Sequence, residues 1–162
     1  MNAKTSRQLL IGILQLAYSG ELAAAYAYQG HWKSVRNIEE KNRIKTIEEE
    51  EWHHRKLVGE MLQILAERPS SWKETKAVLI GRTAGLLCHL TGWLAPMYGA
   101  GKLESRNVRE YEVAARYARD CGRPEFTGSS ACFRKAPSDM ATATSQGKHS
   151  RFIYGSEWLT DG

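Results

Sequence analysis

Apolar residues recur every three or four positions along the first part of the chain, which is the spacing of the buried stripe of a helix. One stripe consists of Ile44, Ile47, Glu51, His54, Val58, Met61 and Leu65. An earlier one consists of Leu10, Leu14, Ala17, Glu21, Ala24 and Tyr28. The pattern predicts two long amphipathic helices with a short link, which would form an antiparallel hairpin.

Capping and helix-breaking residues set the expected ends of the helices. Thr5 or Ser6 can cap the first helix, Pro69 follows the second, and Ser70 or Ser71 can cap a third. The expected ranges are about 5–32, 35–67, 72–94 and, after Ser105, a shorter helix to about Asp120. No segment shows the alternation typical of a strand, so the predicted fold class is all-α.

Glu51 and His54 place a carboxylate and an imidazole at the centre of an apolar stripe. A buried carboxylate without a partner costs several kcal/mol or shifts its pKa until it is neutral. The Glu-x-x-His step on a bundle helix is the unit of di-iron and di-manganese carboxylate sites. The competing frame, Glu50 with His53, has mostly polar companions and is expected to face solvent. The alternative is that this acidic run is only a charged helix surface.

Glu21 interrupts the stripe of the first helix in the same way and is a second candidate metal ligand. Two neighbouring antiparallel helices can bring carboxylates near their middles to the same level. The alternative is a structural carboxylate that is hydrogen-bonded to a core tyrosine, Tyr26 or Tyr28.

A short internal repeat suggests a further ligand. Residues 21–27 match residues 112–118 at five of seven positions, so Glu112 corresponds to Glu21. Glu110 is the second choice, because it stands seven residues before Tyr117, as Glu21 stands before Tyr28.

Length and composition narrow the classes of protein. A chain of 162 residues with 42% apolar residues suits one domain with a sizeable core. The net charge is +5 and basic residues alternate with acidic ones, so nucleic-acid binding has no specific support. The three cysteines form no Cys-x-x-Cys pair, which favours a reducing compartment over a disulfide scaffold. We therefore expect a cytoplasmic protein without a cleaved signal.

The most apolar region, residues 77–98, contains Arg82, His89 and Pro96, which argue against a plain membrane span. Its glycines at positions 81, 85 and 92 allow close helix packing. Two interpretations remain open: a buried core helix, which we favour, or a peripheral contact with the inner face of a membrane.

Three motifs in order carry a family resemblance: Gly20-Glu21, Tyr28-Gln29-Gly30 and Glu51-x-x-His54. Over about residues 8–126 the chain resembles demethoxyubiquinone hydroxylase, a ferritin-like di-iron family of ubiquinone biosynthesis. The resemblance implies a four-helix bundle that holds two irons and hydroxylates the ring of a lipid quinone with O₂. It implies these ligands: Glu21, terminal on one iron; Glu51, bridging; His54, the nitrogen ligand; and Glu112 or Glu110, terminal on the second iron.

The chain departs from the family pattern after Phe126. The second Glu-x-x-His that the family carries is absent from residues 127–162, which contain many Ser, Thr and Gly and no Val. We therefore expect a ferritin-like domain over residues 1–126, a last helix that is missing or replaced, and a poorly ordered tail. An incomplete site implies impaired activity, and uncovered apolar faces imply a homo-oligomer.

Two other functions remain open at this level. One is a ferritin-like or rubrerythrin-like protein that binds iron or handles peroxide without a quinone. The other is a non-enzymatic helical interaction protein with a degenerate metal site. The number of irons bound per chain would distinguish them.

Overall fold

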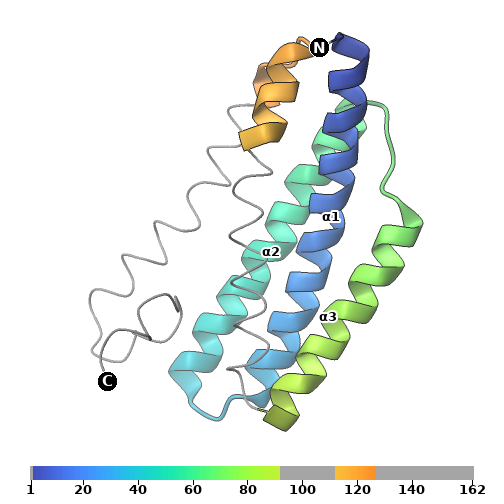
Figure 1. Cartoon of the computed structure of the whole chain (residues 1–162). Coiled ribbons are helices and arrows are strands. Elements are labelled where there is room, and N and C mark those ends of the chain that lie inside the picture. Colours follow the sequence, from blue (N-terminus) through green and yellow to red (C-terminus); the bar gives the residue numbers. More distant parts are fainter. Residues whose placement is uncertain (1, 92–111, 127–162) are drawn as a thin grey trace, which may run out of the picture.

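The computed structural model describes residues 2–91 and 112–126, and every regular element in these ranges is a helix (Figure 1). The helices are α1 (Ala3–Ser34), α2 (Ile38–Ile64), α3 (Ser71–Thr91) and a shorter one over residues 112–120. The all-α, ferritin-like bundle predicted from the sequence is confirmed. The predicted tail over residues 127–162 lies outside the described residues.

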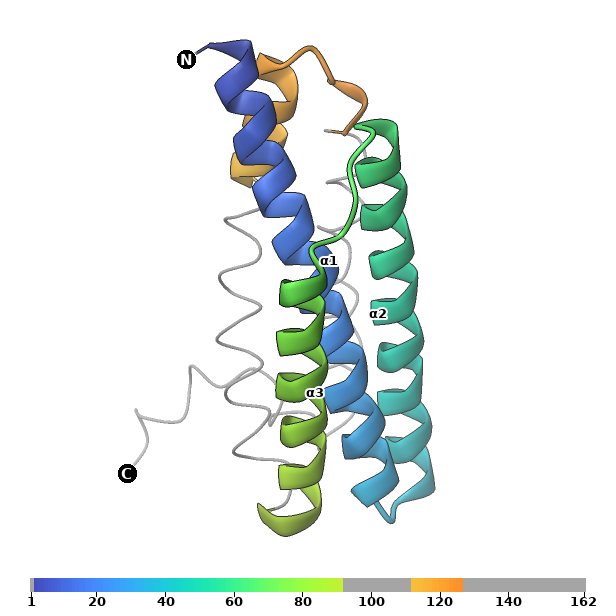
Figure 2. The ribbon, with the colours of Figure 1, turned by 90° about the vertical axis from the view of Figure 1, so that its right-hand side faces the viewer.

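The central helix of the arrangement is α1. It forms an antiparallel hairpin with α2 on one side and packs along α3 on the other (Figures 1 and 2). The segment over residues 112–126 lies beside the N-terminal half of α1, away from α3. Helix α3 therefore covers an outer face of the α1–α2 hairpin.

Two asparagines fix the starts of the hairpin helices. Asn2 caps α1, because its side chain accepts a hydrogen bond from the amide of Lys4 at 3.2 Å. Asn37 caps α2 and accepts from the amides of Glu39 and Glu40 at 2.9 and 3.0 Å. The expected caps at Thr5 or Ser6 are wrong, since both residues lie inside α1, and α2 begins three residues later than expected.

Helix α2 ends at Ile64, earlier than the expected end near residue 67. Ala66 has a φ of 56°, and the amides of Ala66 and Glu67 donate to the carbonyls of Gln63 and Leu62. These paired bonds form a Schellman motif, which satisfies the last carbonyls of the helix. The helix over residues 112–120 ends in the same way at Gly122, where φ is +77°, in agreement with the expected end near Asp120.

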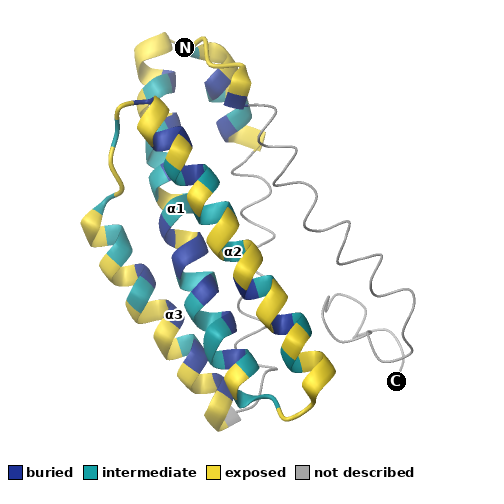
Figure 3. Ribbon diagram, turned by 180° about the vertical axis from the view of Figure 1, so that it is seen from behind, coloured by how far each residue is buried: buried dark blue, intermediate teal, exposed yellow. Residues whose placement is uncertain are grey.

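The hydrophobic core lies at the N-terminal end of α1. Leu10 and Leu14 belong to one buried cluster with residues of α2 and with Ala114, Ala118 and Phe126 of the segment over 112–126. The α2 residues in it are Val58, Met61, Leu62 and Leu65. Three of these four belong to the predicted stripe, while the opposite side of α2 is exposed (Figure 3).

A polar clamp fastens α3 to the hairpin. The Arg55 guanidinium forms an ion pair with the Glu74 carboxylate, donates to the carbonyl of Tyr18 at 2.6 Å, and lies 3.7 Å from the centre of the Tyr18 ring. The Ser19 hydroxyl donates to Glu74 at 2.8 Å. Both charged side chains are mostly buried, so loss of either partner would leave the other uncompensated.

Glycines bring α1 and α3 into backbone contact. A Cβ atom on Gly30 would collide with the backbone of Gly85, and one on Gly81 would collide with the backbone of Ala23. The predicted role of Gly81 and Gly85 in close helix packing is therefore confirmed.

The outward face of α3 is apolar. Its exposed large side chains are Trp72, Leu79, Ile80, Leu86, Leu87 and Leu90. Of the apolar region 77–98, residues 92–98 lie outside the described residues. In the rest, the expected burial holds for Ala77, Gly81, Gly85 and Cys88, whereas Leu79, Leu86 and Leu87 face outward. Among the described helices only α1 is long and apolar enough to cross a membrane, a test that core helices also pass.

Candidate metal centre

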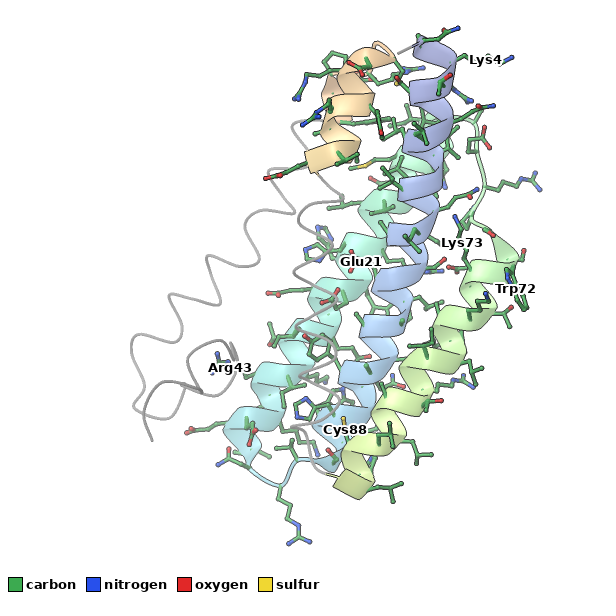
Figure 4. All side chains as sticks on the ribbon, in the orientation of Figure 1. Lys4, Glu21, Arg43, Trp72, Lys73 and Cys88 are labelled. Carbon is green, nitrogen blue, oxygen red and sulfur yellow. The ribbon has the colours of Figure 1, made fainter. Side chains whose placement is uncertain are left out.

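Three potential metal ligands converge between α1 and α2. Glu21 lies about midway along α1 (Figure 4), and Glu51 and His54 lie on α2. One ligand atom from each side chain lies within 4.8 Å of the other two. The antiparallel hairpin therefore brings both glutamates to the same level, as the sequence predicted.

Burial distinguishes the two candidate Glu-x-x-His pairs of α2. The side chains of Glu51 and His54 are 18% and 16% exposed, whereas Glu50 and His53 are exposed residues. Glu21 is more deeply buried, with 7% of the residue exposed. The predicted inward direction of Glu51 and His54 is confirmed, since both continue the stripe of Val58 and Met61.

The donor set suits a divalent metal ion. His54 Nδ1 lies 4.0 Å from Glu51 Oε2, whereas neighbouring ligands at about 2.0–2.2 Å from one ion stand about 3–3.6 Å apart, so the two side chains would move slightly closer together on one ion. Imidazole and carboxylate donors together suit iron, manganese or zinc better than calcium or magnesium. The three side chains are mostly buried, so an ion held by them would be largely shielded from bulk water.

The structure does not bring Glu112 to this group. Glu112 is exposed, whereas Ala114 and Ala118 are the buried residues of its helix. The repeat aligned residue types but did not determine which side of the helix is buried. Glu110 lies outside the described residues. The assignments of Glu112 and, as second choice, Glu110 stay predictions.

Glu48 is a buried carboxylate of α2 that was not predicted from the sequence. It accepts hydrogen bonds from the indole of Trp32 at 2.5 Å, the indole of Trp52 at 3.2 Å and the amide of Gln29 at 3.2 Å. These donors come from α1 and α2, so the carboxylate ties the hairpin together. Its spacing of four residues from Ile44, which is buried, was the only signal in the sequence.

Comparison with known proteins identifies the family. The model of the family described as ubiquinone biosynthesis protein COQ7 matches residues 8–114, which is more than half of the chain. The chain belongs to the COQ7 family. No curated protein and no solved structure matches it.

The family assignment explains the donor set. COQ7 proteins are di-iron carboxylate proteins, and the matched range includes Glu21, Glu51, His54 and both candidates for the next glutamate. Membership supports a role for the chain in ubiquinone biosynthesis.

Proposed function

We propose that the chain binds iron at Glu21, Glu51 and His54 and acts as an O₂-dependent hydroxylase of a lipid quinone ring in ubiquinone biosynthesis. The observation that carries the proposal is the convergence of these three side chains in a member of the COQ7 family. The family supplies the reaction class, and the geometry supplies the residues.

Each residue of the centre has a distinct task in this proposal. Glu21 and Glu51 balance the positive charge of the metal, and His54 adds a neutral nitrogen donor from the same face of α2. Bound ferrous iron would supply the electrons for O₂ activation. Hydrogen bonds from Arg55 to the carbonyl of Tyr18 and from Trp32 and Gln29 to Glu48 join α1 to α2, so the ligands keep their mutual distances before any metal arrives.

The second half of the centre is the weak part of the proposed site. The chain matches four of the six ligands implied by the family, counting Glu112 or Glu110, and residues 127–162 contain no second Glu-x-x-His. A second iron would lack a bridging carboxylate and a nitrogen donor. We therefore propose that hydroxylation is impaired. We also propose that copies of the chain form a homo-oligomer, which covers the apolar helix faces that a complete bundle would bury.

The purified chain is expected to hold one iron per chain firmly and a second weakly, and to hydroxylate a demethoxyquinone slowly, because half of the ligand set is missing. The measurements are iron content by elemental analysis after gel filtration and product formation by chromatography. Two firmly held irons with rapid hydroxylation would show that the tail supplies ligands. Iron uptake without quinone turnover would favour a ferritin-like protein, and no iron uptake an interaction protein.

We also propose that the outward face of α3 rests on a membrane surface, where the lipid quinone resides. Leu79, Ile80, Leu86 and Leu90 are each more than half exposed, which is unusual for a helix that faces water. The exposed basic residues Lys76 and Arg82 stand on the same helix and favour an anionic lipid surface. Peripheral attachment at the inner face of the membrane would follow.

Replacing Leu86 and Leu90 together by glutamate is expected to abolish co-sedimentation with anionic phospholipid vesicles, because each charge would have to enter the acyl boundary. Replacing Leu9 and Leu16 of α1, which are 42% and 49% exposed, is the matched control and should leave sedimentation unchanged. If wild type does not sediment but forms a dimer that the Leu86 and Leu90 changes disrupt, a second copy covers this face instead.

A further inference from the structure

His31 is a buried polar side chain that the packing does not explain. Only 4% of the residue is exposed, and neither Nδ1 nor Nε2 has a hydrogen-bond partner in the structure. Burial lowers the pKa of the imidazole from its usual 6.5, so it is neutral at neutral pH. A neutral imidazole carries one donor and one acceptor, and buried groups of this kind are normally paired. Ser6, with an unpartnered hydroxyl at the other end of α1, is the only other such side chain among the described residues.

His31 shares a buried face of α1 with Glu21. The spacings from Glu21 to Tyr28 and from Tyr28 to His31 are seven and three residues, and all three residues are buried. Ten residues of helix correspond to about 15 Å, so His31 lies well beyond direct contact with the metal ligands. It stands on the interior side of α1, toward the end of the bundle where α3 also ends.

The same part of α1 adjoins the apolar face of α3. Gly30, the neighbour of His31, packs against the backbone of Gly85, and the residues after Gly85 are the outward-facing Leu86 and Leu87. Cys88, which Figure 4 labels near the C-terminal end of α3, lies about one turn beyond Gly85 and is buried. His31 therefore lies at the level of the C-terminal half of α3, on the helix against which α3 packs.

We propose that His31 is a hydrogen-bonding contact for the ring oxygens of the quinone, between the membrane-facing part of α3 and the metal centre. The inference rests on the proposed function, since a lipid quinone is the ligand class considered there. A quinone oxygen accepts the imidazole N–H, and a quinol hydroxyl donates to the other nitrogen. The ring is uncharged and the surroundings are apolar, whereas a buried anion would gain no charge partner from a neutral imidazole.

The test measures quinone binding and stability together, with the full chain. The probe is a benzoquinone with one isoprenoid unit, and its binding is read from quenching of tryptophan fluorescence. His31→Phe is expected to weaken binding about tenfold, the effect of one lost hydrogen bond, and to raise the midpoint of thermal unfolding, since unpaired buried nitrogens disappear. His31→Gln keeps a donor and an acceptor, and should bind within about twofold of wild type.

Ser6→Ala is the matched control for this test. It removes the other unpartnered buried group and should raise the unfolding midpoint without any change in quinone binding. Comparison of Ser6→Ala with His31→Phe therefore distinguishes the loss of a quinone contact from the gain in stability that removal of a buried unpaired group gives.

Each outcome has a defined meaning. Wild-type binding by His31→Phe, while Glu51→Ala loses iron, would overturn the His31 contact and leave the proposed function intact. A His31→Phe protein that is less stable than wild type would show that the imidazole has a structural partner, which also overturns the inference. If wild type binds iron but no quinone, the quinone part of the proposed function fails, and the His31 contact fails with it.

Discussion

Replacing Glu51 by alanine is expected to abolish iron binding, while replacing Glu50 by alanine leaves it nearly unchanged. The two residues are adjacent and chemically identical, but only Glu51 lies with Glu21 and His54 inside the hairpin. Losing one of three ligands removes the charge that balances the metal and opens a coordination position. We expect at least a tenfold loss of iron affinity for Glu51→Ala, measured by elemental analysis of folded protein after dialysis.

The paired variants also control for stability. Glu51 is half-buried at the level of the ligand group, and its removal leaves the core around Leu10 and Val58 untouched, so both variants should keep the helical content of wild type by circular dichroism. Equal loss of iron in both variants would mean that the metal is held by the acidic surface of α2. No loss in either would remove the metal centre from the proposed function.

The helical periodicity of the sequence was sufficient to predict the hairpin and the direction of its polar residues. A period of 3.6 residues assigns each position of α2 to one side, and burial of Ile44, Val58 and Met61 is a strong energetic constraint on that assignment. Glu51 and His54 follow because they occupy the same side. The family motifs then add the chemistry that periodicity alone does not specify.

Features that depend on partners from another helix were not predictable in this way. Glu48 is buried because Trp32 and Gln29 of α1 donate to it, and neither is near it in the sequence. The repeat that suggested Glu112 compared residue types over seven positions and carried no information about which face Ala114 and Ala118 bury. The start of α1 was missed because Thr5 and Ser6 are as able to cap a helix as Asn2 is.

Helix α1 contacts both α2 and α3, so the proposed metal centre and the proposed membrane face both depend on it. One side of α1 presents Glu21 to the ligands of α2, and another side packs against α3, which carries the proposed membrane face. Contact between α1 and α3 is made through backbone atoms at the glycines, so it cannot be relieved by turning a side chain. A change there would separate the metal centre from the apolar surface that is proposed to deliver its substrate.

Gly81→Ala is therefore expected to lower the free energy of unfolding by about 1–3 kcal/mol, the range for overpacking a close contact. The new Cβ would lie 2.8 Å from Tyr26 Cβ and 2.9 Å from Ala23 Cα, where real Cβ atoms essentially never approach, so α3 must move away from α1. Gly12→Ala is the matched control, because no atom lies within 4 Å of its added Cβ. Since alanine favours helix over glycine, this control should raise stability by about 0.5–1 kcal/mol.

Gly81→Ala and Gly12→Ala are expected to change the free energy of unfolding in opposite directions. Both substitutions gain the same intrinsic helix propensity, so the difference between their urea midpoints, at equal slope, reports only the contact between α1 and α3. Equal stabilisation by both would mean that the helices lie farther apart than the structure shows. With the predicted signs, Gly81→Ala should also weaken vesicle binding while iron binding at Glu21, Glu51 and His54 is retained, because the α1–α2 hairpin that holds these ligands does not include α3.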